Sequence, residues 1–125
     1  TVPERRPPAG GTPASPSTHL ILGERRDKPA CSPIGLHGVC GRGYLHRRSV
    51  VVGDVRVMGP DYIACDPRDQ SEVVVPLLTA AGDCVGVLDV DSYDLSAFSE
   101  GDARGLEAVL MAAGLTVGGA HVDVL

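Results

Sequence analysis

Four cysteines pose the first chemical question of this sequence, because a thiol can attack a substrate, bind a metal or lie inert in a core. They are Cys31, Cys40, Cys65 and Cys84. No C-x-x-C pair occurs, so a structural zinc site is poorly supported. Cys65 lies in the polar stretch "DYIACDPRDQS", whereas structural cysteines usually lie within apolar runs. Static disulfides are rare in cytosolic proteins, so these thiols are expected to be either buried and inert or redox-active.

Three acidic residues occur where two expected strands of a hairpin meet. Asp89 and Asp91 alternate along "GVLDVDS", so both side chains point to one face of a strand. Glu72 opens the partner strand, and pairing about the turn places it opposite residues 90–91. Like charges in a partly buried pocket raise the pKa of at least one carboxyl group, which can then act as a general acid near neutral pH. Three solvated surface carboxylates at a strand end are the alternative.

The loops that carry the thiols differ in their surroundings. Cys65 precedes Glu72 by seven residues, on the loop that enters its strand, so it is expected near the acids. Acidic neighbours raise the pKa of a thiol, and a positively charged substrate would relieve this effect. Cys31 and Cys40 lie on a Gly/Pro-rich loop, and mobile loops suit thiols that form a transient disulfide. Cys84, within "DCVGVLD", is expected to be a packed core thiol.

The elements that must position these side chains follow from hydrophobic periodicity and turn residues. The expected elements are strands over 18–23, 49–55, 72–79 and 83–92, one or two helical turns over 43–48, and long loops over 24–43 and 56–71. The last two strands form a hairpin through the turn at 80–82. Pro76 predicts that the first of them is an edge strand, or that a bulge lies there.

The last expected element is an amphipathic helix. The S-x-x-D pattern of "SEGD" predicts an N-cap at Ser99, and the helix ends near Gly114. Its apolar positions at helical spacing are Ala103, Leu106, Val109, Leu110 and Ala113. No element is predicted for residues 116–125. Residues 1–17, rich in proline, are expected to be a disordered or loose tail, and residues 18–125 a single α+β domain in which a helix packs on one face of an antiparallel sheet.

Composition excludes some classes of protein and weakens others. The net charge is −5, with an excess of Lys and Arg in residues 1–50 and of Asp and Glu in residues 51–125. Aromatic residues make up only 3% of the chain, so nucleic-acid binding is a weak interpretation and a solvated charged surface the favoured one. No apolar run is long enough to span a bilayer, and the first residues lack a secretory signal. A soluble, cytoplasmic protein is therefore expected, without a membrane or nucleic-acid partner.

Together these stretches resemble one family, the GAF-domain free methionine-(R)-sulfoxide reductases. The matching stretches are "LILGERRDKPAC", "GLHGVCG", "DYIACDPRDQSEVVVPL", "VGVLDVDS" and "FSEGDARGLEAV", which run in family order from about Leu20 to Leu110. GAF domains that only bind small molecules lack this set of cysteines. The resemblance implies a GAF-like fold, in which an antiparallel sheet is flanked by helices and a ligand pocket lies between sheet and loops.

The resemblance also implies roles for single residues. Cys65 of "IACD" corresponds to the catalytic thiol, Cys31 of "KPAC" to its resolving partner, and Cys40 of "GVCG" to a lesser participant. The family's substrate-binding acids correspond to Glu72, Asp89 and Asp91. The implied reaction reduces free methionine-(R)-sulfoxide through a sulfenic acid and an intramolecular disulfide. It needs no metal and no bound cofactor, and a thioredoxin-like protein supplied by NADPH restores the thiols.

The chain departs from the family at its start. Family members begin with a helix and an aromatic-rich strand, whereas a Pro-rich segment stands here and the only phenylalanine is Phe98. The histidine that usually precedes "IACD" is Tyr62. Three interpretations therefore stay open: an active reductase, a GAF module that binds a small molecule without catalysis, and an incomplete, inactive homologue. A strand from a second chain could complete the sheet, which predicts a homodimer.

Overall fold

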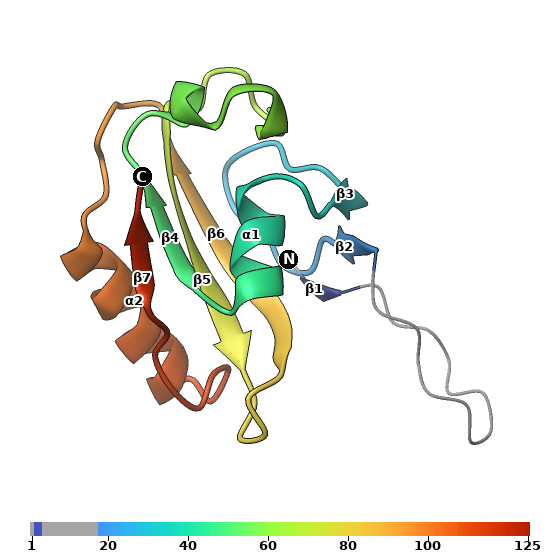
Figure 1. The fold of residues 1–125 in the computed structure, drawn as a ribbon, viewed down its shortest axis with the longest axis vertical. Helices are drawn as coiled ribbons and strands as arrows, with labels where there is room; N and C mark the ends of the chain where they lie inside the picture. Colours follow the sequence, from blue (N-terminus) through green and yellow to red (C-terminus); the bar gives the residue numbers. More distant parts are fainter. Residues whose placement is uncertain (1, 4–17) are drawn as a thin grey trace.

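The structure is a computed structural model that describes residues 2–3 and 18–125. In chain order the elements are β1 (Val2–Pro3), β2 (His19–Ile21), β3 (Ile34–Gly35), α1 (Val39–His46), β4 (Ser49–Val52), the 3₁₀ helix η1 (Val55–Asp61), β5 (Ser71–Leu78), β6 (Cys84–Ser92), α2 (Glu100–Ala112) and β7 (Val122–Val124). The main sheet has the order β6-β5-β4-β7, and a small sheet has the order β1-β2-β3. Figure 1 shows α2 on one face of the main sheet, and α1 and the small sheet on the other.

The β5–β6 hairpin has the register that the sequence predicts. Glu72 pairs with Asp91, and the ladder continues in this register to Leu77, after which a bulge shifts it by one residue. Because side chains alternate along a strand, Glu72, Asp89 and Asp91 all lie on the face that α1 covers. The hairpin therefore brings the three acids to one side of the sheet.

Pro76 does not mark an edge strand, which corrects one of the two expectations for it. β5 lies between β6 and β4. Pro76 pairs with Val87, and the bulge lies just beyond it, between Leu77 and Leu78. The pairing of β5 with β4 ends at Val74. Pro76 therefore lies beyond the ladder that β4 forms, where its missing N–H removes no bond to that strand.

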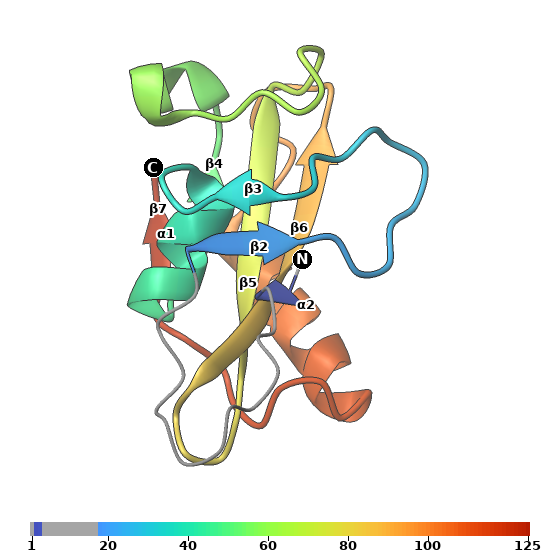
Figure 2. The same ribbon diagram turned by 90° about the vertical axis from the view of Figure 1, so that its right-hand side faces the viewer.

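Two aliphatic cores lie on the two faces of the main sheet. The core under α1 contains Leu20, Val39, Cys40, Val50, Val52, Val55, Val74 and Val87. The core under α2 contains Val51, Val73, Val75, Ala103, Leu110 and Val122. Hydrophobic periodicity alone predicted a helix on one face, whereas the family resemblance implied a sheet flanked by helices, and the two helices that cover the sheet confirm the latter (Figure 1). In Figure 2, β2 and β3 cross β5 and β6 on the α1 side, which adds a second cover to that face.

Helix α1 begins within the predicted loop, four residues before the expected helical turns. Its N-cap, Gly38, makes no side-chain capping bond, so the usual start signal is missing. Gly41 and Gly43 are typical of loops, yet both are buried inside the helix. A Cβ atom on Gly41 would collide with the backbone of Leu36, and one on Gly43 would lie 2.8 Å from Val74. The glycines therefore allow close packing rather than a loop.

Helix α2 begins where predicted, but the residues that it buries differ from the predicted apolar positions. Ser99 and Asp102 form a capping box, which confirms the N-cap, and the helix ends at Ala112. Val109 is 65% exposed, whereas Glu107 is buried. The carboxylate of Glu107 accepts bonds from Ser49 Oγ at 3.0 Å, the Ala120 backbone N–H at 3.1 Å and Arg104 Nη1 at 3.1 Å. A carboxyl group that ties α2 to β4 and to the segment before β7 thus replaces the expected apolar contact.

Among the other elements, two were predicted from the sequence and two were not. The predicted strands over 18–23 and 49–55 are confirmed as β2 and β4, while η1 lies in a predicted loop and β7 in a segment without a predicted element. Within the predicted tail, Val2 and Pro3 pair with β2, and residues 1 and 4–17 lie outside the described part. The domain limits stay a prediction. No helix of the described residues is long and apolar enough to cross a membrane.

Replacing Gly41 with alanine is expected to destabilise the protein by about 2 kcal/mol or more, because the added methyl group overlaps the Leu36 backbone. Urea unfolding measures this change. Gly105, in the middle of α2, has no atom within 4 Å of the same position. Gly105→Ala is the matched control and is expected to gain up to about 1 kcal/mol. Equal effects of the two substitutions would contradict the role given to Gly41.

Candidate functional site

Two of the four cysteines form a disulfide, and it joins two loops. Cys31 lies between β2 and β3, Cys65 lies between η1 and β5, and their Cα atoms are 5.4 Å apart. Cys40 is free and buried in α1. Cys84 is free and only half-buried at the turn end of β6, which corrects its expected place in the core. The structure thus brings three of the four thiols to one region.

The three acids meet the disulfide at a small cavity on the α1 side of the sheet. Its volume is about 30 Å³. The polar side chains around it are those of Cys40, Cys65, Tyr62, Asp69, Glu72, Asp89 and Asp91. The structure therefore brings together every residue that the sequence proposed for the site except Cys31, which reaches it through its bond to Cys65.

Burial governs the proton equilibria of these acids. Glu72 is only 5% exposed. Its burial, and then the charges of Asp89, Asp91 and Asp69, raise its pKa well above the usual value. Burial and the same kind of repulsion raise the pKa of Asp91 to about 8, and Lys28 opposes this shift. The alternative of solvated surface carboxylates is wrong, because Glu72 is buried and Asp89 and Asp91 are half-buried. Burial and mutual repulsion favour the protonated forms of Glu72 and Asp91.

Cys40 has the same environment as the acids. It is 4% exposed, and its burial, followed by the charges of Asp89 and Glu72, raises the pKa of its thiol well above the usual value. A thiol in this state is a poor nucleophile, because the thiolate is the reactive form. Burial therefore favours the neutral form of the Cys40 thiol, and its part in the reaction stays a prediction.

A mixed set of ligand atoms lies at the base of the cavity. Among residues 2–3 and 18–125, one group has the spacing of a metal site: the Cys40 thiol and the carboxylates of Glu72 and Asp89 lie within 4.8 Å of one another. Metal binding would have to remove the protons that burial holds on Cys40 and Glu72. The expectation that the protein uses no metal stays a prediction.

One carboxylate oxygen in the site has no hydrogen bond within the described part of the chain. Oδ1 of Asp89 is buried and accepts no bond from a described backbone N–H or basic side chain, although the Cys40 thiol and the Glu72 and Asp91 carboxyl groups lie within reach of its carboxylate. A buried, unsatisfied oxygen costs free energy, and a ligand that donates a hydrogen bond would relieve it. The position is therefore suited to an N–H or O–H group of a small molecule.

The sequence did not indicate two further residues of the site, Asp69 and Lys28. Asp69 is buried at the cavity, and Nζ of Lys28 lies 3.2 Å from its Oδ1. Both are polar residues close in sequence to a cysteine, Lys28 before Cys31 and Asp69 after Cys65. That closeness was the available signal, but contact between two loops leaves no periodic pattern.

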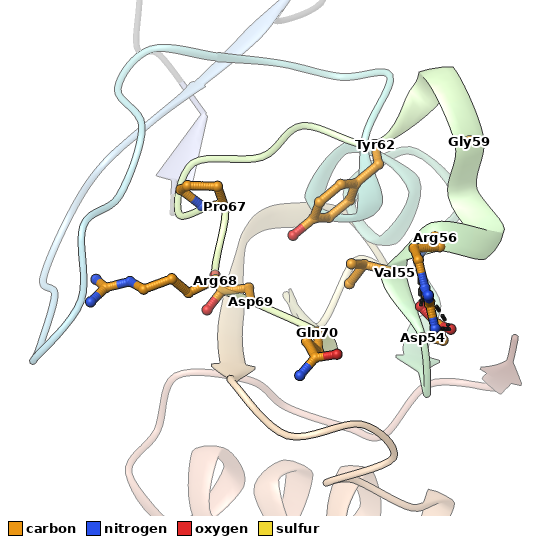
Figure 3. A pocket seen from close by; sticks show the side chains of 9 residues that line it. All are labelled: Asp54, Val55, Arg56, Gly59, Tyr62, Pro67, Arg68, Asp69 and Gln70. Atoms are coloured by element: carbon orange, nitrogen blue, oxygen red, sulfur yellow. Dashed lines mark hydrogen bonds and ion pairs between the residues drawn. The ribbon is translucent and has the colours of Figure 1, made fainter.

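Two larger hollows adjoin the buried cavity. One, of about 650 Å³, shares Tyr62 and Asp69 with it, and Figure 3 shows both side chains on its wall together with Gln70 and Val55. The other, of about 580 Å³, lies between the loop at 22–30 and β6, and it shares Asp89 and Asp91 with the cavity. A small movement of these shared side chains would open the cavity to solvent on either side.

The fold and the cavity define a GAF-type protein. A solved GAF domain has a TM-score of 0.72 to this chain at 35% identity, covering 81% of this chain and 58% of that one. A type II free methionine-R-sulfoxide reductase from Thermoplasma acidophilum has a TM-score of 0.65 at 32% identity, covering 84% of this chain and 75% of that one. The chain belongs to the free methionine-R-sulfoxide reductase family.

A curated relative agrees with the solved structures. The free methionine-R-sulfoxide reductase of Saccharomyces cerevisiae is 39% identical over 97 residues, which are 77% of this chain and 53% of the yeast protein. The chain spans about half the length of the curated relatives it matches. No family model matches the chain.

The raised pKa of Asp91 predicts how stability depends on pH. The folded protein keeps a proton on Asp91 up to about pH 8, whereas the unfolded chain loses it near pH 4. The unfolded state therefore binds fewer protons between these values, and stability is largest at low pH and falls as the pH rises to 8. Asp91→Asn is expected to reduce this slope by up to about 1.4 kcal/mol per pH unit.

Urea unfolding at intervals from pH 5 to pH 8 measures the slope. Asp94→Asn is the matched control, because Asp94 is an exposed aspartate three residues further along the chain. It is expected to leave the slope unchanged. The same slope in wild type and Asp91→Asn would show that Asp91 is ionised in the folded protein.

Proposed function

We propose that this chain reduces free methionine-(R)-sulfoxide to methionine. The observation that carries the proposal is a disulfide between Cys31 and Cys65 that closes a cavity walled by buried, partly protonated acids. Relatives that bear the name of this reductase support it. A GAF module that only binds a ligand would have no use for a disulfide at the pocket, so the catalytic interpretation is favoured over the non-catalytic one.

In the first step the Cys65 sulfur attacks the sulfur of the sulfoxide. Glu72 lies on the cavity wall, and burial with the neighbouring acids raises its pKa, so it is the group that donates a proton to the sulfoxide oxygen as the sulfur–oxygen bond breaks. The hydroxyl group so formed is transferred to the Cys65 sulfur as the transient bond between the two sulfurs breaks. Methionine leaves, Cys65 becomes a sulfenic acid, and the Cys65 proton restores the Glu72 carboxyl group. The sulfoxide is thereby reduced by two electrons and Cys65 is oxidised by two.

In the second step the Cys31 thiol attacks the sulfenic sulfur of Cys65. A disulfide forms and one water molecule leaves, which gives the oxidised form seen here. A thioredoxin-like protein then reduces the disulfide by thiol exchange, with electrons from NADPH. No metal or bound cofactor takes part in this scheme.

The oxidised form is closed to substrate. A water molecule needs roughly 10–15 Å³ of such a cavity, so about 30 Å³ holds water but no amino acid. Reduction breaks the bond between Cys65 and Cys31, so the Cys65 side chain can move away from the cavity. Methionine sulfoxide then enters from the hollow that shares Tyr62 and Asp69 with the cavity. Binding is therefore limited to the reduced form, which is also the form that can react.

The acids select a free amino acid. Its α-ammonium group carries three donors and a positive charge, which suit the unpartnered Oδ1 of Asp89 and the neighbouring Asp91. A methionine within a peptide has no such group. Binding of the cation would also offset the mutual repulsion of the acids.

The proposal also covers the partners of the protein and its location in the cell. The thioredoxin-like reductant implies a cytoplasmic enzyme that repairs oxidised methionine under oxidative stress. A homodimer is part of the proposal, because large apolar side chains are exposed on α2 and in the segment after it. They are Val109, Met111, Leu115 and Val117. A second copy would cover such a surface.

Cysteine variants test the order of the two steps. With free methionine-(R)-sulfoxide, thioredoxin, its reductase and NADPH, Cys65→Ser is expected to lose NADPH consumption by at least about a thousandfold, because it removes the nucleophile. Cys31→Ser is expected to stop after one turnover per chain and to keep a sulfenic acid that dimedone labels. Cys84→Ser is the matched control, since Cys84 lies outside the cavity.

Peptide mapping of wild type after oxidation by the substrate is expected to find the Cys31–Cys65 bridge. A Cys40–Cys65 bridge alone would mean that Cys40 is the resolving thiol. A folded wild-type protein that consumes no NADPH would contradict the proposed function itself, and full activity in Cys65→Ser would contradict the attacking role.

Substrate selection by the acids can be tested with an acetylated substrate. Free methionine-(R)-sulfoxide is expected to have a kcat/KM at least about a hundredfold above that of its N-acetyl derivative, because acetylation removes the charge that the acids bind. Asp89→Asn is expected to narrow this ratio, and Asp94→Asn to leave it unchanged. Equal kcat/KM values of the wild-type protein for the two substrates would show that the acids do not recognise the ammonium group.

A further inference from the structure

The two loops that carry Cys31 and Cys65 are joined a second time, without a covalent bond. Lys28 lies three residues before Cys31, and Asp69 lies four residues after Cys65. Nζ of Lys28 is 3.2 Å from Oδ1 of Asp69, and the side chains of this pair are only 25% and 6% exposed. The ion pair therefore connects the same two loops as the disulfide, close to it on the chain.

Lys28 also fixes the first loop to the end of β6. Its Nζ donates a bond of 2.9 Å to the backbone carbonyl of Asp91, and it lies 3.9 Å from the centre of the Tyr93 ring. The ammonium group thus touches a carboxylate, a carbonyl and an aromatic face. Three partners from two other segments hold one flexible side chain in place.

Tyr93 holds the second loop to the same end of β6. Its hydroxyl group donates a bond of 2.8 Å to Oδ2 of Asp66, the residue next to Cys65. The guanidinium group of Arg68 lies 4.8 Å from the centre of the Tyr93 ring, and its Nε donates to Asp66 at 3.0 Å. Lys28 and Tyr93 therefore attach both cysteine-bearing loops to the same end of β6.

We propose that Lys28 is a positioning residue that holds Cys31 within reach of Cys65 while the disulfide is open. None of the contacts of Lys28 uses a sulfur atom, so reduction of the disulfide removes none of them directly. A pair of groups held close together reacts as if at high local concentration. Lys28 thereby promotes the step in which the Cys31 thiol attacks the Cys65 sulfenic acid, with loss of water, and has no part in the first step.

The naming of Cys65 as the oxidised sulfur rests on the proposed function, but the effect of Lys28 on the thiol pair does not. Two measurements without methionine sulfoxide therefore test it. The first is the equilibrium of the Cys31–Cys65 pair with reduced and oxidised glutathione, which gives the effective concentration of one thiol toward the other. The second is the lifetime of the sulfenic acid that hydrogen peroxide forms, followed by dimedone labelling.

Lys28→Met removes the charge and keeps an unbranched apolar chain. The effective concentration is expected to fall about three- to tenfold, and the sulfenic acid to live longer by a similar factor, which is the size of effect of a partly buried ion pair with a cation–π contact. Asp69→Asn tests the same contact from the other loop. The double variant is expected to show little more than either single change, because both remove one interaction.

Arg26→Met is the matched control. Arg26 lies in the same loop, and its side-chain hydrogen bonds to described residues go to Glu24 and to the Arg25 carbonyl of that loop. It is expected to leave both measurements unchanged, and urea unfolding of the oxidised proteins checks that all variants are folded. Unchanged values in both Lys28→Met and Asp69→Asn would overturn the proposal, as would an equal fall in Arg26→Met. A fall confined to Lys28→Met and Asp69→Asn in a protein that fails to reduce methionine sulfoxide would support the positioning role and refute the proposed function.

Discussion

The site depends on the confinement of several acidic groups to one poorly solvated space. Glu72, Asp89, Asp91 and the thiol of Cys40 lie around a cavity of about 30 Å³. Ionising all of them there would place like charges together with little water to screen them, which raises the pKa of Glu72 and of Asp91. The same repulsion creates a proton donor, a site for a cation and a thiol that stays unreactive. One constraint thereby supplies three of the properties that a sulfoxide reductase needs.

The disulfide borders this acidic space, because Cys65 lies on the cavity wall. Cys65 and Cys31 lie on two loops above the cavity, and the disulfide between them leaves room for water only. Lys28 is the cation that borders this region, and its contacts with Asp69 and Asp91 oppose the accumulated negative charge. The Lys28 side chain thus offsets negative charge at the cavity and also holds the loop of Cys31 against the loop of Cys65. We therefore expect a change at Lys28 to affect the resolving step without removing a reacting group.

The hairpin and its acids could be predicted because they obey period-two alternation and a short turn. The turn limits the partner of Glu72 to residues 90–91, and the bulge after Leu77, whose position the turn does not predict, sets the partner at Asp91 and so places the acids on one face. Helix α1 could not be predicted, because Gly41 and Gly43 are typical of loops and only their contacts with Leu36 and Val74 explain them. Contacts between loops, such as those of Lys28, depend on the folded chain and leave no pattern in the sequence.

A single turnover without any added reductant tests the central claim most directly. The fully reduced protein is mixed with excess free methionine-(R)-sulfoxide, the methionine formed is counted per chain, and the thiols that remain are titrated. The account predicts one methionine per chain and the loss of two thiols, those of Cys31 and Cys65, with no loss from Cys40 or Cys84. No methionine, or methionine formed while all four thiols remain, would contradict it.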